Sequence, residues 1–177
     1  MKILDARRIC LVVFFTSLTA ILAQITIYLP FTPIPITLQT LAVVLSGIIG
    51  GALVGFLSQV MYIALIILGF PFAAGLKGGL VVLLGPTAGF LYGFPVAATI
   101  SGLIAGRIGN KTRKQLLLTS LVGVFSVYPT GLLWLNLVYG IKENLLSITI
   151  LPFIPGDVVK AFIASELAYR ITRIRLK

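Results

Sequence analysis

The chain has 177 residues, of which 59% are hydrophobic and only 10% are charged, and its formal net charge is +10. Soluble domains are about 25% charged, so this composition excludes an ordinary soluble domain. The sequence has no histidine and one cysteine, which excludes histidine-ligated metal sites, Ser-His-Asp triads and an internal disulfide.

The first half of the chain is free of charge over a long stretch. No charged side chain occurs from Ile9 to Leu76, which is enough for about three membrane crossings at roughly 20 residues each. The apolar segments predict six membrane-spanning helices in an all-α integral membrane protein. Their expected ranges are 9–28, 37–49, 52–68, 87–105, 116–139 and 156–171. We expect one compact bundle and a single domain, residues 1–177.

Glycine and proline separate the expected helices. The first ends at LPFTPIP, whose prolines remove backbone donors and favour an extended loop. Gly50 and Gly51 connect the second helix directly to the third. The stretch GFPFAAGLKGGLVVLLGP is too rich in glycine and proline for a regular helix. Glycines four residues apart, such as Gly47 and Gly51, predict close packing inside the bundle, or a docking face for another membrane protein.

The basic residues predict the orientation. With a cytoplasmic N-terminus and six crossings, only Lys77 and Lys142 fall on the outer side, and Lys160 lies within the last span. The remaining eleven basic residues face the cytoplasm, as the positive-inside rule requires: Lys2, Arg7, Arg8, Arg107, Lys111, Arg113, Lys114, Arg170, Arg173, Arg175 and Lys177. Both termini are therefore expected to be cytoplasmic, in a multi-pass protein of the cell inner (cytoplasmic) membrane.

The four carboxylates differ in their surroundings. Asp5 and Glu143 lie at the ends of spans, where solvation is expected. Glu166 precedes Arg170 by four residues, a spacing that favours an ion pair on one helix face. Asp157 lies within an apolar segment, where a charge is costly.

Asp157 and Lys160 are the candidate ligand-binding charges. They are three residues apart and share a helix face near its outer end. Two interpretations remain open from spacing alone. The charges form a salt bridge that caps the helix, or they line a polar pocket in which Lys160 donates to an anionic ligand and Asp157 accepts from ligand N–H groups.

Other polar and glycine residues fall at the same outer depth of the predicted helices. They lie at the start of the second span, in the glycine-rich loop, early in the fourth span and late in the fifth. Irregular backbone within a membrane is tolerated where it lines a cavity, so we expect a small-molecule site there. Its further candidate residues are Thr37, Gln39, Gly75, Lys77, Gly78, Thr87, Tyr92 and Asn136.

Three stretches carry a resemblance to a known family. They are AQITIYLPFTPIPITLQTLAVVLSG, GFPFAAGLKGGLVVLLGPTAGFLYGFPVAA and LPFIPGDVVKAF. In this order they resemble the BioY family, the biotin-binding S components of energy-coupling factor (ECF) transporters. The resemblance implies a six-helix bundle, a pocket closed by the loops after the first and third helices, and Asp157 and Lys160 as ligand contacts. We expect Lys160 to bind the biotin carboxylate and Asp157 the ureido N–H groups, although the two roles could be exchanged.

The resemblance also implies partners. These are biotin as the ligand, and a transmembrane coupling subunit with two ABC ATPases as the energising module, although the protein could work without that module. No enzyme activity, cofactor or nucleic acid is expected. The coupling subunit of such transporters docks on an Ala-x-x-x-Ala face of the first helix. Thr16 and Ala20 stand at the matching positions, so one alanine is replaced. Lys77 also departs from the small residues expected in its loop, and it either binds the carboxylate or reaches the lipid headgroups.

Three other functions remain as alternatives. The first is an S component for another vitamin, such as thiamine or riboflavin. The second is a membrane enzyme that uses Asp157 and Glu166 as acid and base, although nine residues of helix separate them by about 13 Å. The third is a structural scaffold, for which changes at Asp157 and Lys160 have little effect on uptake.

Overall fold

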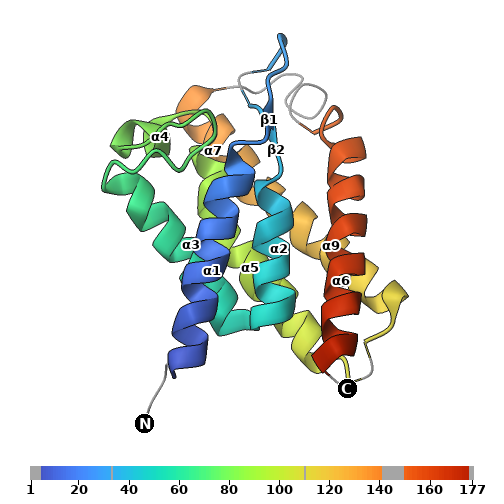
Figure 1. Ribbon diagram of the computed structural model, residues 1–177. Coiled ribbons are helices and arrows are strands. Elements are labelled where there is room, and N and C mark those ends of the chain that lie inside the picture. Colours follow the sequence, from blue (N-terminus) through green and yellow to red (C-terminus); the bar gives the residue numbers. More distant parts are fainter. Residues whose placement is uncertain (1–4, 33, 110, 141–149, 176–177) are drawn as a thin grey trace.

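The computed structural model describes residues 5–32, 34–109, 111–140 and 150–175, and helices dominate it (Figure 1). Two short antiparallel strands lie between the first two helices, β1 (Thr26–Ile27) and β2 (Ile36–Thr37). The helices are α1 (Ala6–Ala23), α2 (Gln39–Gly50), α3 (Ala52–Ile67), α4 (Leu80–Leu84), α5 (Ala88–Arg107), α6 (Arg113–Phe125), α7 (Tyr128–Tyr139) and α9 (Ile154–Arg175). The expectations for Lys2, Pro33, Lys142, Glu143 and Lys177 lie outside the described residues.

Most helix ends agree with local sequence signals. Asp5 caps α1, because its carboxylate accepts a hydrogen bond of 2.9 Å from the backbone N–H of Arg8. Thr112 and Gln115 form a capping box at the start of α6. Gly51 adopts a φ of 84° and makes the tight connection between α2 and α3.

The expected helices differ from the structure at several places. Helix α4 lies in the stretch that was expected to be too broken for a regular helix, and α9 ends at Arg175 rather than at residue 171. The first helix ends at Ala23 rather than at residue 28, because the chain continues into a β-hairpin in which Thr26 pairs with Thr37. The expected fifth span is two helices, α6 and α7, which are separated at residues 126 and 127. Pro129 lies in the first turn of α7, where a proline begins a helix better than it continues one.

Three apolar stretches of the described residues are long enough to cross a membrane. They are Ala6–Ala23, Ala88–Arg107 and Arg113–Tyr139, the last of which includes both α6 and α7. Helices α2 and α3 are apolar but shorter. Helix α9 has 22 residues, and it carries Asp157, Lys160 and Glu166 among its apolar positions.

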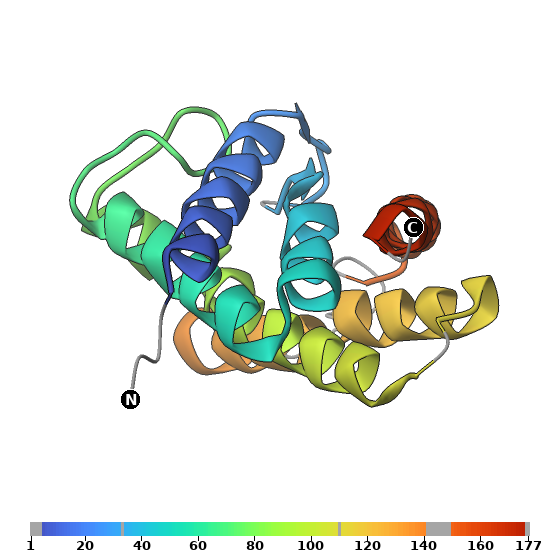
Figure 2. The ribbon, with the colours of Figure 1, turned by 60° about the horizontal axis from the view of Figure 1, so that its bottom comes forward.

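Helix α2 is central to the bundle. It packs against α1, α3, α5, α6 and α9, and Figure 2 shows it between α1 and α9. Its residues from Leu41 to Ile48 are all buried, as expected for a helix surrounded by others. A Cβ atom added to Gly47 would lie only 2.1 Å from the backbone oxygen of Ala98 in α5. The glycine therefore permits the close approach of α2 and α5.

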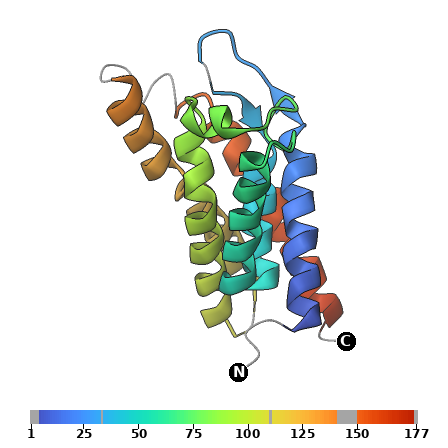
Figure 3. The same cartoon turned by 90° about the vertical axis from the view of Figure 1, so that its left-hand side faces the viewer.

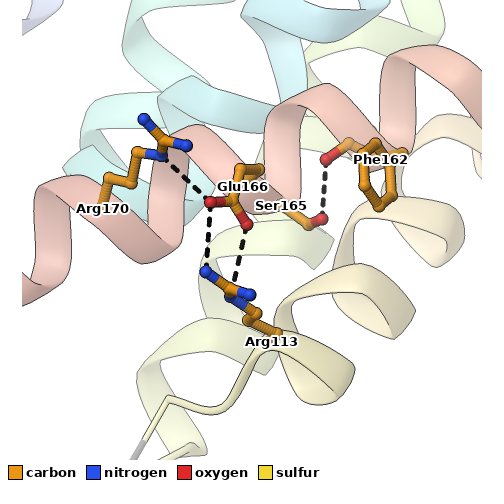
Figure 4. Close-up of polar contacts among 5 residues, drawn as sticks. All are labelled: Arg113, Phe162, Ser165, Glu166 and Arg170. Carbon is orange, nitrogen blue, oxygen red and sulfur yellow. Dashed lines mark hydrogen bonds and ion pairs between the residues drawn. The ribbon is translucent and has the colours of Figure 1, made fainter.

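Helices α6 and α9 are joined by an ionic cluster (Figure 4). Glu166 accepts from Arg170 at 3.0 Å, which confirms the predicted pair, and it also contacts Arg113 of α6 at 3.4 Å. The guanidinium groups of Arg113 and Arg173 lie 4.8 and 5.1 Å from the ring centroid of Tyr169. Glu166 therefore has a structural role between two helices.

The two ends of the bundle differ. The β-hairpin, α4 and the loop formed by residues 69–79 lie at one end (Figures 1 and 3). Helix α1 begins and α9 ends at the other end. The irregular segments therefore gather at a single end of the molecule.

Candidate functional site

A cavity of about 410 Å³ lies at the end of the bundle that carries the loops. Its volume is within the range of about 300–1,000 Å³ that is typical of small-molecule sites. Residues from the hairpin, α2, the 69–79 loop, α4, α5, α7 and α9 form its wall. The cavity therefore brings together segments from the whole length of the chain.

Asp157 and Lys160 form an ion pair in the wall of this cavity. Their exposed fractions are only 4% and 5%, so the pair is shielded from solvent. Lys160 Nζ also donates a hydrogen bond of 3.0 Å to the backbone oxygen of Thr37. Tyr128 Oη donates to the second carboxylate oxygen of Asp157. These bonds connect α9 to the hairpin and to α7.

The pair still has hydrogen-bonding capacity. A lysine ammonium has three N–H donors, and Asp157 and Thr37 accept two of them from Lys160. A carboxylate has about four lone-pair positions, so Asp157 can accept more than its two protein donors. The pair has no net charge, yet it can offer both a donor and acceptors to a ligand. Such a surface suits a neutral polar group.

A chain of hydrogen bonds extends from this pair to the 69–79 loop. Thr37 Oγ1 donates to Gln39 Oε1 at 2.8 Å, and Gln39 Nε2 donates to Tyr62 Oη at 2.6 Å. Tyr62 Oη then donates to the backbone oxygen of Phe72 at 2.9 Å. The chain therefore links the hairpin, α2, α3 and the loop.

The side chain of Gln24, just after α1, also fixes the 69–79 loop. Its amide nitrogen donates to the backbone oxygens of Phe72 and Ala73 at 3.3 and 3.2 Å, and its oxygen accepts from the N–H of Leu76 at 3.0 Å. Gly75 has a φ of 71°, and a Cβ atom there would lie 2.4 Å from Tyr28 Oη. The loop and the hairpin segment thus meet where only a glycine fits.

The remainder of the wall is mainly apolar and aromatic. Phe90 and Phe94 of α5 line the cavity together with Phe153, which precedes α9. Phe90 packs edge-on against Tyr128, with ring centroids 6.2 Å apart. Trp134 Nε1 donates to the backbone oxygen of Gly85 at 3.0 Å, and Gly85 itself lines the cavity. Trp134 is therefore a natural fluorescence reporter for events in the cavity.

The ten ligand-binding candidates from the sequence divide into two groups. Six of them line the cavity: Thr37, Gln39, Lys77, Thr87, Asp157 and Lys160. The other four lie outside its wall: Gly75, Gly78, Tyr92 and Asn136.

Each of the four excluded candidates has a different environment. Gly75 and Gly78 belong to the loop, but they pack against Tyr28 and against the backbone of Phe70. Tyr92 points towards α4, where its hydroxyl donates to the backbone oxygen of Leu83 at 2.8 Å. Asn136 lies on the exposed face of α7. Position along the chain therefore does not determine whether a residue reaches the cavity.

The expected docking residues are buried within the bundle. Thr16 and Ala20 have exposed fractions of 3% and 7%. Thr16 Oγ1 donates to the backbone oxygen of Ser58 in α3 at 2.9 Å. Both side chains are therefore enclosed in the described bundle, and their role in docking stays a prediction.

Sequence reasoning missed three polar residues of the site. Tyr128 contacts Asp157, and Tyr62 holds both Gln39 and the 69–79 loop. Thr40 lines the cavity one turn after Thr37. Its buried hydroxyl has no hydrogen-bond partner among the described residues. Tyr128 was detectable as a polar residue next to Pro129, but tyrosine and threonine are too common in membrane helices to single out the other two.

Comparisons with known proteins agree over nearly the whole chain. The BioY family model matches residues 1–177. The probable biotin transporter BioY of Pyrococcus horikoshii is 38% identical over 95% of this chain and 98% of its own. The probable biotin transporter BioY of Bacillus subtilis is 36% identical over 98% of this chain and 92% of its own.

A solved structure shares the fold. It is a crystal structure of the S component for biotin from an ECF-type ABC transporter. The match has a TM-score of 0.86 at 27% identity, and it covers 94% of this chain and 91% of the other.

Proposed function

The chain belongs to the BioY family, and we propose that it is a membrane-embedded S component that captures biotin for uptake into the cell. The observation that carries this proposal is the buried Asp157–Lys160 pair of the PGDVVK motif, which lines a cavity of suitable size. The names of the relatives are those of biotin transporters. We assign no reaction and no cofactor to the protein.

The chemistry of biotin fits the cavity. Its ureido ring offers two N–H donors and one carbonyl acceptor, which match the acceptors of Asp157 and the remaining donor of Lys160. Its thioether ring and aliphatic chain are apolar, as are Phe90, Phe94 and Phe153 in the wall. Thr37, Gln39 and Thr87 complete the proposed set of polar residues around the ligand.

We further propose six membrane crossings, with both termini in the cytoplasm and the cavity near the outer surface. The strong excess of basic residues on one side supports this orientation. Helix α2 has 12 residues and is about 18 Å long, too short to cross alone. The hairpin continues it towards the outer surface, and irregular backbone is tolerated there because it lines a cavity.

The proposed location is the cytoplasmic membrane, and the proposed partners are those of an ECF transporter. They are a transmembrane coupling subunit and two ABC ATPases that supply energy. The similarity to an S component from such a transporter supports this assembly.

The alternatives fit the site less well. Thiamine is a cation, whereas Asp157, Lys77 and Lys160 give the cavity wall a net positive charge. A membrane enzyme that uses Asp157 with Glu166 would need the two side chains at one centre. Glu166 instead pairs with Arg113 and Arg170, outside the cavity.

A ligand panel tests the proposal directly. Purified protein in detergent is titrated with biotin, thiamine and riboflavin while the fluorescence of Trp134 is followed, with calorimetry as a second measurement. We expect a saturable response to biotin alone. A response to thiamine or riboflavin without one to biotin would reject biotin as the substrate. If none of the three vitamins gave a response, the structural scaffold would be the better interpretation.

The unpartnered hydroxyl of Thr40 leads to a prediction about the ligand contacts. Buried hydroxyl groups normally have a hydrogen-bond partner. The hydroxyl of Thr40 is enclosed in the ligand-free structure, so we expect its side chain to turn into the cavity when biotin binds and to form a hydrogen bond with the ligand. Thr40→Val keeps the shape of the side chain and should weaken biotin binding by about threefold to tenfold, as for the loss of one neutral hydrogen bond. Calorimetric titration measures the difference.

A matched control for Thr40 exists in the same molecule. Ser120 of α6 is the other buried hydroxyl without a partner among the described residues, and it does not line the cavity. Ser120→Ala should therefore leave biotin affinity unchanged, and Thr40→Ser should retain it. Equal affinities of Thr40→Val and wild type would show that the hydroxyl does not contact biotin.

A further inference from the structure

The two lysines that line the cavity are not equivalent. Lys160 is 5% exposed, and its charge is already paired with that of Asp157. Lys77 is exposed to solvent, so it lies at the mouth of the cavity rather than in its interior. Among the described residues, no carboxylate forms an ion pair with Lys77. The mouth therefore has an uncompensated cation.

The charge balance of the wall favours an anionic ligand at that place. Asp157, Lys160 and Lys77 are its only Asp, Glu, Lys or Arg residues in the described part of the chain, and together they give a net charge of +1. Asp157 and Lys160 cancel each other. A ligand with one negative charge is therefore matched best if its anionic group lies near Lys77.

The backbone of Lys77 is held in place although its side chain is exposed. The oxygen of Lys77 accepts from the N–H of Ala73 at 2.9 Å, and the N–H of Gly79 donates to the oxygen of Ile66 at 2.7 Å. The contacts of Gln24 hold the same loop from the side of α1. The lysine stem thus begins from a fixed point and can adjust its ammonium group to a ligand.

We infer that Lys77, rather than Lys160, binds the carboxylate of the substrate and so selects free biotin over its neutral derivatives. This inference rests on the proposed function. It revises the division of roles expected from the sequence, because the neutral Asp157–Lys160 pair then receives the neutral ureido ring. Biotin lies with its ring towards α9 and its carboxylate at the mouth, beside the 69–79 loop.

A comparison of biotin with biotin methyl ester tests this assignment. The ester has the same ring and chain but no negative charge. Wild-type protein should bind biotin about tenfold more tightly than the ester. This ratio is at the lower end for a hydrogen bond to a charged group, because solvent around the exposed Lys77 weakens the interaction. Lys77→Gln should lose most of this preference through weaker biotin binding, while its affinity for the ester stays within about twofold of wild type.

Two controls make the comparison specific. Lys77→Arg retains the charge and should retain the preference. Lys114→Gln removes an exposed lysine of α6 that does not line the cavity, and it should behave as wild type. The preference of the wild type should also shrink as salt is raised, because the charge at the mouth is screened.

The outcomes separate the two proposals. If Lys77→Gln keeps the full preference for biotin over the ester, Lys77 does not bind the carboxylate and extends instead towards the lipid headgroups. If the preference is lost in Lys160→Met and retained in Lys77→Gln, the roles are those first expected from the sequence. Failure of the wild type to bind either compound would overturn the proposed function itself.

Discussion

Replacing Lys160 by methionine is expected to abolish biotin binding, with a loss of at least about 100-fold, and to destabilise the protein by about 3–5 kcal/mol. The substitution leaves the carboxylate of Asp157 buried without its cation and removes the donor to the backbone of Thr37. Calorimetry measures the binding, and thermal unfolding followed by fluorescence in detergent measures the stability.

A double variant separates binding from folding. Lys160→Met combined with Asp157→Asn removes both charges, so no unpaired ion remains in the low-dielectric interior. We expect most of the stability to return, because buried ion pairs often contribute little net stability. Biotin binding should remain absent. Binding near the wild-type level in the stable double variant would contradict the proposed role of the pair.

Replacing Gly47 by alanine is expected to destabilise the bundle strongly. The new Cβ atom would lie 2.1 Å from the backbone oxygen of Ala98 and 2.9 Å from the backbone nitrogen of Gly102. Both atoms belong to the backbone of α5 and cannot rotate away. We expect a loss of about 2–3 kcal/mol, although alanine favours a helix more than glycine does.

Gly106 supplies the matched control. It lies in α5, and a Cβ atom added to it meets nothing within 4 Å. Gly106→Ala should leave the unfolding temperature in detergent unchanged or raise it slightly, since only helix propensity changes. Equal unfolding temperatures for the two variants would show that α2 and α5 are not in close backbone contact.

The helices could be predicted from the sequence with good accuracy, because apolar length and glycine or proline boundaries determine them. For α3 the expected range 52–68 differs from the observed helix by one residue. The hairpin could not be predicted, since its strands have only two residues each and depend on long-range contacts such as Thr26 with Thr37. Pro129 was a local signal for the separation of α6 from α7. The signal was overlooked because the apolar stretch runs through it without interruption.

The centre of the candidate site could also be predicted, and its edges could not. Asp157 and Lys160 were conspicuous because a membrane segment rarely retains charges. Thr40 gave no comparable signal, because most threonines in apolar helices bond their own backbone and mark no site. Tyr128 gave only a weak signal, as a polar residue beside Pro129. Tyr92 and Asn136 were expected at the site from their positions along the helices, and neither lines the cavity.

The hydrogen bonds that run from Lys160 through Thr37, Gln39 and Tyr62 to Phe72 have a consequence for how the cavity admits its ligand. Withdrawal of the 69–79 loop must rupture the bond from Tyr62 and those from Gln24 in the same event. We therefore expect the loop to open as one unit rather than residue by residue. If it does, the frequency of that opening limits how fast any ligand can enter the cavity.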